Sequence, residues 1–331
     1  MLQWQSMSQD SFGRNIHYLR ISLTDHCNLR CVYCMPEEMR FQPRSELLTQ
    51  DEILTVARAA RDLGFDKIRL TGGEPTVRPD LLGIVRGLSG MGFRALSMTT
   101  NGLRLRELAR PLKEAGLERV NVSVDTLDAD RFRRITRWGR LEAVLDGIRA
   151  AEEAGLIPLK INAVVVRGYN DNDVADLAAL TLEHPWQVRF IEMMPFGEVA
   201  QFAKDGVVSQ EEIVARIAEK LGPLESVDGG RLDGEARLFQ LRGAKAAIGF
   251  ISTITNPFCS TCSRVRLTAD GKLRLCLLRD DEGDLRTLLR NGASLEALKQ
   301  RMGELIYRKP WGHGLPENII PLQRVMSQIG G

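Results

Sequence analysis

The 331-residue sequence has little net charge, only four histidines and no long apolar run. A formal net charge of +2 provides no overall field for nucleic acid or a membrane surface, so an anion site must come from local groups of arginines. No apolar stretch approaches the roughly 18 residues of a membrane span, and the N-terminus lacks the apolar segment of a signal peptide. We therefore predict a cytoplasmic protein. The histidines, which are His17, His26, His184 and His313, have no acidic or nucleophilic partner in the sequence pattern that would indicate a hydrolase.

Six cysteines fall into two groups of three. The first trio, which is Cys27, Cys31 and Cys34, lies within eight residues. In a cytoplasmic protein such a group is more typical of metal binding than of disulfides. A structural zinc site usually takes four protein ligands, and the only nearby fourth candidate, His26, is adjacent to Cys27 and therefore awkwardly placed for a shared tetrahedral site. Three thiolates suit a 4Fe-4S cluster that leaves one iron open for chemistry.

The second trio, which is Cys259, Cys262 and Cys276, also has no histidine or further cysteine nearby. Its Cys-x2-Cys pair with one additional thiol is similar to an incomplete zinc ribbon. The spacing alone leaves three interpretations open: a zinc site, a second iron-sulfur cluster, or structural and redox-active thiols.

Hydrophobic patterns predict six strands separated by helices in the first part of the chain. No hairpin signal interrupts them, so the pattern favours a parallel sheet with helical crossovers. We expect an α/β fold, an incomplete six-stranded (β/α)6 TIM-like barrel with its site at the carboxyl ends of the strands; a flavodoxin-like open sheet is the alternative. The predicted strands span 18–24, 67–71, 93–99, 119–124, 159–166 and 187–192, and the predicted helices span 49–63, 79–88, 104–115, 129–136, 141–154 and 172–182.

The pattern changes after Met194. It predicts a helix at 209–221, a glycine-rich loop, short strands at 236–241 and 246–251, and helices at 285–290 and 294–307. We place a boundary at Gly229, which divides the chain into a barrel domain of residues 1–228 and a smaller α+β domain of residues 229–331 that closes the barrel mouth.

Several motifs carry a resemblance to known enzymes. The first trio, with the aromatic Tyr33 before its last cysteine, resembles the signature of the radical S-adenosylmethionine enzymes. The motif Gly72-Gly73-Glu74-Pro75, the segment 256–266 (NPFCSTCSRVR) and the final Gly330-Gly331 resemble the GTP 3',8-cyclases of molybdenum cofactor biosynthesis. The match runs from about Tyr18 to the last residue. It implies a partial barrel, S-adenosylmethionine as cosubstrate, and a 4Fe-4S cluster with one open iron on each trio.

The resemblance also implies roles for individual residues, each of which has an ordinary structural reading as well. A buried arginine needs an anionic partner, either an internal salt bridge or, by resemblance, the triphosphate of GTP. A polar residue at a strand end often caps a helix, and a methionine often fills the core. By resemblance the residues that bind GTP are Arg20, Arg69, Thr99, Lys160, Arg264, Val265 and Arg266. Those that bind S-adenosylmethionine are Tyr33, Gly73, Ser123 and Met194. The resemblance also makes the six cysteines cluster ligands and the tail of Gly330 and Gly331 a catalytic segment.

The reaction that this resemblance implies is a radical cyclisation by a lyase. A low-potential electron donor reduces the first cluster, S-adenosylmethionine is cleaved to a 5'-deoxyadenosyl radical, and this radical abstracts the ribose 3' hydrogen of GTP. The product, (8S)-3',8-cyclo-7,8-dihydroguanosine 5'-triphosphate, passes to cyclic pyranopterin monophosphate synthase. The chain is expected to act as a monomer or homodimer.

Two other functions remain open from the sequence. A different radical S-adenosylmethionine enzyme with an auxiliary cluster, such as one that matures a peptide, would keep the first trio but would not require Arg264, Arg266 or the Gly-Gly end. A non-catalytic iron-sulfur or zinc-binding module would not cleave S-adenosylmethionine after reduction.

Overall fold

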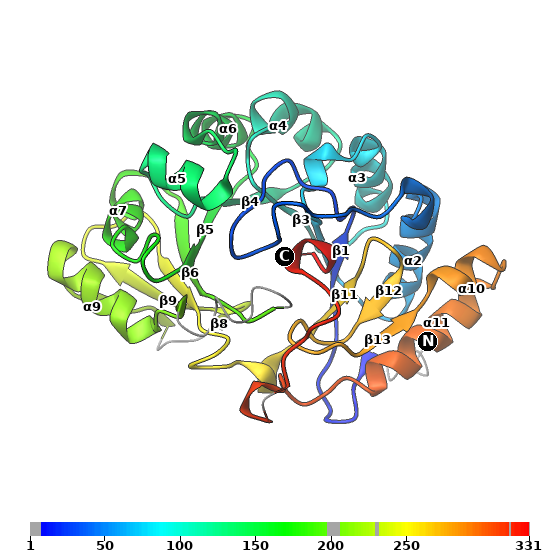
Figure 1. The fold of residues 1–331 in the computed structure, drawn as a ribbon. Helices are drawn as coiled ribbons and strands as arrows, with labels where there is room; N and C mark the ends of the chain where they lie inside the picture. Colours follow the sequence, from blue (N-terminus) through cyan, green and yellow to red (C-terminus); the bar gives the residue numbers. More distant parts are fainter. Residues whose placement is uncertain (1–7, 197–205, 229–231, 318, 331) are drawn as a thin grey trace.

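The computed structural model describes residues 8–196, 206–228, 232–317 and 319–330. Within these residues, thirteen strands form one sheet whose centre is parallel (Figure 1). Six strands from the first part of the chain lie side by side in chain order, each parallel to the next. They are β1 (Tyr18–Ser22), β2 (Lys67–Thr71), β3 (Ala95–Thr100), β4 (Arg119–Ser123), β5 (Lys160–Val165) and β6 (Gln187–Glu192). The sequence predicts all six to within two residues at each end.

Helices surround the outer side of these strands in Figure 1. They are α2 (Gln50–Asp62), α3 (Leu81–Ser89), α4 (Leu105–Glu114), α5 (Ala129–Thr136), α6 (Leu141–Glu153) and α7 (Val174–Glu183). Helix α2 begins with a capping box, because Thr49 accepts a hydrogen bond from the backbone N–H of Glu52 and the Glu52 side chain accepts one from Thr49. Its Ile53, Val56 and Ala60 recur at helical spacing and are buried in the core shared with the strands.

The remainder of the chain adds strands to both edges of the six-stranded parallel sheet. Strand β11 pairs parallel with β1, strand β10 pairs parallel with β6, and antiparallel strands continue the sheet from each. The strands are β7 (Leu224–Ser226), β8 (Leu232–Asp233), β9 (Ala236–Leu241), β10 (Ile248–Ile251), β11 (Arg264–Leu267), β12 (Lys272–Arg274) and β13 (Glu282–Asp284). The helices are α9 (Gln210–Leu221), α10 (Arg286–Arg290) and α11 (Leu295–Tyr307).

The sequence predicts β9 and β10 but not β7, β8, β11, β12 or β13. The missed strands have two to four residues each, which is too short for an alternating hydrophobic pattern to stand out. The predicted boundary at Gly229 lies outside the described residues, and the division into two domains stays a prediction. Among the described helices, none combines the length and the apolarity that a bilayer crossing requires.

The pairing of β11 with β1 aligns three arginines across the sheet. Arg20 on β1 lies opposite Arg266 on β11 and opposite Arg69 on β2. Residues in register on neighbouring strands point to the same face of a sheet. Arg266, Arg20 and Arg69 therefore form an arginine row across three adjacent strands, drawn from both ends of the chain.

Candidate active site

A cavity of about 270 Å³ is lined by the parallel strands, by the loops that follow them and by the C-terminal part of the chain. Both cysteine trios line this cavity. The other predicted site residues in its lining are Arg20, Tyr33, Arg69, Gly73, Thr99, Ser123, Met194, Arg264, Val265 and Arg266. The structure therefore brings most of the predicted residues to one place, while their individual roles stay predictions.

Two predicted site residues lie outside this lining, and a third is not among the described residues. Lys160 begins β5 and shares a strand face with Asn162 and Val164, which line the cavity, so it lies one layer closer to the amino ends of the strands. Gly330 lies beside the cavity, where its carbonyl accepts a hydrogen bond of 3.0 Å from Nη1 of Arg266. Gly331 lies outside the described residues.

The first trio lies on the loop that follows β1. A turn brings two of its members together, since the backbone N–H of Cys34 donates a 2.9 Å hydrogen bond to the carbonyl of Cys31. Burial raises the pKa of Cys27 to about 11, with the Glu74 carboxylate adding to the effect, and burial raises the pKa of Cys34 to about 12. Thiolates are therefore unfavourable here unless a cationic metal centre stabilises them.

Two glycines after β2 allow the backbone to pass next to this cysteine loop. A Cβ atom on Gly73 would lie 2.4 Å from the carbonyl oxygens of Asp25 and His26, and one on Gly72 would lie 2.7 Å from that of Thr24. The backbone N–H of Gly73 also donates to the Thr24 carbonyl at 2.6 Å. The lack of a side chain at these two positions therefore permits a close approach of the backbone to the cysteine loop.

Two buried acids beside the first trio are missing from the predicted site residues. Glu74 accepts a 2.7 Å hydrogen bond from the backbone N–H of Asn101, whose side chain lies 4.0 Å from Sγ of Cys27. Asp125 accepts a 2.7 Å hydrogen bond from the hydroxyl of Tyr33, and burial raises the pKa of Asp125 to about 6. Both acids stand next to strand ends in the sequence, but only the tertiary structure places them against the thiols.

Basic groups lie beside the second trio. Burial raises the pKa of Cys262, but the positive charges of Arg264 and Lys309 outweigh this and lower it to about 6. Lys309 is itself buried and donates a hydrogen bond to the carbonyl of Leu275. At Cys259, burial raises the pKa. The two trios thus share a cavity, but the acids Glu74 and Asp125 outweigh the nearby Arg30 at the first trio, whereas basic groups lie beside the second.

The spacing of the thiols indicates which kind of metal centre fits. Among the described residues, no three Cys, His, Asp or Glu side chains are close enough together to hold a single metal ion. With Zn–S bonds of about 2.3 Å, the sulfurs of a tetrahedral zinc site would be only about 4 Å apart. A 4Fe-4S cluster holds its ligands further apart, because each ligand binds a different iron. The first trio, three thiols on one loop, is a donor set of the kind that holds an iron-sulfur cluster.

The arginine row lines the same cavity. Arg20 forms a salt bridge with Glu235, which is one of the two kinds of anionic partner expected for a buried arginine. The Nε atoms of Arg20 and Arg69 are nevertheless buried without a hydrogen-bond partner among the described residues. Burial lowers the pKa of Arg69, which indicates how costly its charge is in this position. Buried guanidinium groups whose Nε atoms have no partner among the described residues indicate a site for an anionic ligand.

Two asparagines in the cavity were not predicted. Asn121 on β4 is completely buried, and Asn162 lies on β5. Both side-chain amide atoms of Asn121, and the amide oxygen of Asn162, have no hydrogen-bond partner among the described residues. Buried amides are normally satisfied, so these groups are candidates for binding the polar groups of a ligand. A signal was present in the sequence, because asparagine is unusual inside a strand.

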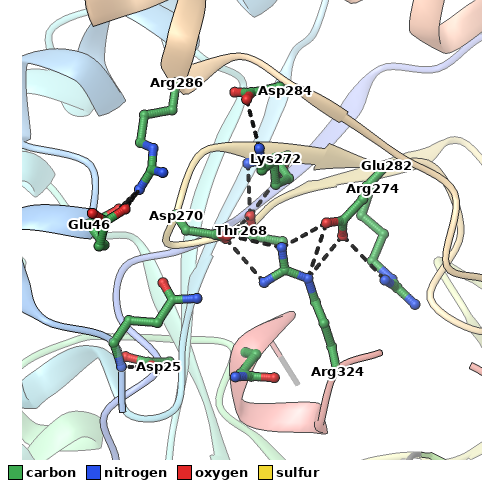
Figure 2. Close-up of polar contacts among 12 residues, drawn as sticks. Asp25, Glu46, Thr268, Asp270, Lys272, Arg274, Glu282, Asp284, Arg286 and Arg324 are labelled. Carbon is green, nitrogen blue, oxygen red and sulfur yellow. Dashed lines mark hydrogen bonds and ion pairs between the residues drawn. The ribbon is translucent and has the colours of Figure 1, made fainter. Parts of the chain in front are cut away.

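The C-terminal tail is held beside the cavity by Arg324 (Figure 2). Its Nη2 atom donates to Asp270 at 2.9 Å and to Glu282 at 2.7 Å. Further along, Gly330 adopts a φ of +76°, and a Cβ atom there would lie 2.4 Å from Oγ1 of Thr71. The end of the chain therefore lies against β2, and a side chain at Gly330 would be both strained and obstructed.

Between these points the tail contacts the first trio and shares an apolar cluster with a member of the second. The backbone N–H of Ser327 donates a hydrogen bond to the Cys34 thiol. Ile329 is fully buried in a small apolar cluster against which Cys276 packs. The tail thus lies close to residues of both trios.

Comparisons with known proteins agree with this geometry. Residues 21–181 match the radical SAM superfamily model, and residues 186–315 match the model described as Molybdenum Cofactor Synthesis C. The fold is similar to that of Streptococcus suis SuiB bound to precursor peptide SuiA, with a TM-score of 0.62 and 15% identity over 94% of this chain and 68% of that chain. It is also similar to anSMEcpe with bound AdoMet, with a TM-score of 0.58 and 14% identity over 92% of this chain and 82% of that chain. The fold and the cysteine loop define a radical S-adenosylmethionine protein.

Relatives that match over their full length identify the family within this class. The chain is 46% identical to the GTP 3',8-cyclase of Thermodesulfovibrio yellowstonii and 48% identical to that of Pelotomaculum thermopropionicum, over 98% of this chain and 100% of each relative. The chain therefore belongs to the GTP 3',8-cyclase family. This finding confirms the resemblance that the sequence motifs carry.

Proposed function

We propose that this protein cyclises GTP to (8S)-3',8-cyclo-7,8-dihydroguanosine 5'-triphosphate with S-adenosylmethionine as cosubstrate, in an early step of molybdenum cofactor biosynthesis. The observation that carries this proposal is that both cysteine trios and the arginine row line a single cavity. A cavity with thiols for metal centres and guanidinium groups for an anion suits a redox reaction on a nucleotide.

Each trio is proposed to hold a 4Fe-4S cluster with one open iron. When bound, the first cluster supplies an electron, received from a low-potential donor, for the cleavage of S-adenosylmethionine. The acidic surroundings of the first trio support this assignment, because nearby negative charge lowers the reduction potential of a cluster. The second trio, with its basic surroundings, is proposed to hold the cluster that faces the substrate.

The chain's own side chains are proposed to bind and orient the two substrates. Tyr33, Gly73, Ser123 and Met194 would contact S-adenosylmethionine, and the hydrogen bond from Tyr33 to Asp125 fixes the tyrosine. The GTP contacts are proposed to come from Arg20, Arg69, Thr99, Lys160, Arg264, Val265 and Arg266. Holding base, sugar and phosphates in one geometry supplies much of the rate enhancement of a cyclisation.

The Gly-Gly tail is proposed to complete the site as a catalytic segment. Its support is the hydrogen bond from Arg266 to the carbonyl of Gly330, which connects the tail to a proposed GTP-binding residue. A bulky residue in place of Gly331 is expected to leave both clusters intact and abolish cyclisation, as measured by product formation. Unimpaired turnover would refute the role of the tail.

We also propose the architecture and partners that the sequence predicts. A partial six-stranded barrel, residues 1–228, would carry the first cluster, and residues 229–331 would close its mouth and carry the second. The product would pass to cyclic pyranopterin monophosphate synthase, and the chain would work as a monomer or homodimer.

An anaerobic reconstitution tests the main proposal. Two four-iron clusters correspond to about eight irons per chain, and 5'-deoxyadenosine should form in a manner that depends on GTP. About four irons per chain, with 5'-deoxyadenosine formation that does not respond to GTP, would contradict it.

A further inference from the structure

Glu235 is a buried acid at the tip of a short hairpin. It follows Gly234, whose φ is +69°, and the two residues connect β8 to β9. The Glu235 side chain is only 6% exposed and lines the cavity that holds both trios. A buried carboxylate in a cavity of this kind requires compensating positive charge.

That charge comes from two arginines on neighbouring strands. Oε1 of Glu235 accepts a hydrogen bond from Nη2 of Arg20 at 2.5 Å and another from Nη1 of Arg264 at 2.7 Å. Burial raises the pKa of Glu235, but the guanidinium groups of Arg264 and Arg20 outweigh this effect and hold it well below the usual range. Glu235 is therefore an anion whose single oxygen bridges two guanidinium groups, as an oxygen of a phosphate group does.

One carboxylate does not satisfy this group of cations. The Nε atoms of Arg20 and Arg69 remain buried without a hydrogen-bond partner among the described residues. Burial lowers the pKa of Arg266, and the charges of Arg20 and Arg264 lower it further. A larger anion with more oxygens would compensate these charges better than Glu235 can.

We propose that Glu235 is an internal competitor for the triphosphate of the nucleotide. This inference rests on the proposed function, in which Arg20 and Arg264 bind GTP. Glu235 occupies N–H groups of Arg20 and Arg264 that a phosphate would otherwise use, so the triphosphate gains these hydrogen bonds only by displacing Glu235. A ligand that lacks phosphates does not compete with Glu235. The residue therefore tunes the affinity of the site for polyanionic ligands, separately from recognition of guanine and ribose.

Binding measurements on the reconstituted protein test this proposal. The probes are inorganic triphosphate, GTP and guanosine, followed by isothermal titration calorimetry under anaerobic conditions. Glu235→Gln keeps the shape of the side chain and removes its charge, so inorganic triphosphate and GTP should bind about tenfold more tightly, while guanosine binding stays unchanged. Glu225→Gln, at an exposed position on β7, changes the net charge equally and should leave all three affinities unchanged.

A second variant guards against a simple loss of folding. Glu235→Asp keeps the charge but withdraws the carboxylate by one methylene, and it should tighten triphosphate binding by a smaller factor than Glu235→Gln. Equal or weaker triphosphate binding in folded Glu235→Gln would overturn the proposal and assign Glu235 the task of holding the arginines in place. If the wild-type protein bound neither GTP nor inorganic triphosphate, the proposed substrate site itself would fail, which is a distinct result.

Discussion

Glu74 and Asp125 lie beside the first cysteine trio, whereas Arg264 and Lys309 lie beside the second. The two trios have the same number of thiols and line the same cavity, so their ligands alone do not distinguish them. Their charged neighbours do. Negative charge makes addition of an electron to a cluster less favourable, and positive charge makes it more favourable. The two proposed cluster sites would therefore differ in reduction potential because of residues outside the cysteine motifs.

Removal of one cysteine from each trio gives the largest expected effect. Cys34→Ser and Cys262→Ser should each reduce the iron content from about eight to about four per chain. In Cys34→Ser, the rate of S-adenosylmethionine cleavage should fall by about a thousandfold or more, because no first cluster would be present to donate the electron. In Cys262→Ser, cleavage should persist without cyclisation. The measurements are iron analysis and chromatography of 5'-deoxyadenosine and of the cyclised nucleotide; identical behaviour of the two variants would remove the distinction between the trios.

Release of the C-terminal tail should have an intermediate effect. Arg324→Met removes the bonds to Asp270 and Glu282, so cyclisation should fall by about 10- to 100-fold while both clusters remain. Arg324→Lys should recover part of the loss, because lysine keeps the charge but not the paired geometry. Arg301→Met, which breaks an ion pair with Glu304 on α11, serves as the control and should change little. Wild-type product formation by Arg324→Met would show that the tail does not need this anchor.

The smallest expected effect concerns the reduction potentials. Lys309→Met removes a positive charge beside the second trio, and the potential of the second cluster should fall on the order of 50 mV. Asp125→Asn removes a negative charge beside the first trio, and the potential of the first cluster should rise by a similar amount. Potentiometric titration followed by electron paramagnetic resonance measures both. A shift of the same sign and size at both clusters in either variant would contradict the electrostatic account.

The parallel strands and their helices could be predicted because their signals are local. Strand β2 is predicted at its observed bounds, and the capping box of Thr49 and Glu52 marks the start of α2. The cysteine spacing likewise predicts metal ligands at the first trio before any folding is considered. Such signals lie within a few residues of one another, so a single sequence contains them.

The pairing of the outer strands and the long-range contacts of their side chains could not be predicted, because they depend on residues far apart in the chain. Strand β11 has four residues, two of them arginines, and it pairs with β1 from the opposite end of the chain. The alignment of Arg20 with Arg266 follows only from that pairing. Glu235 is a similar case, because no local pattern shows that a hairpin turn reaches a pair of distant arginines.

The position of β10 and β11 has a consequence for synthesis of the protein. When β6 has emerged from the ribosome, β1 and β6 are both edge strands with open backbone groups, and each acquires its outer neighbour only from the last third of the chain. Open edges of a sheet invite pairing with other chains. The nascent protein therefore exposes two open sheet edges until β10 and β11 pair with β6 and β1.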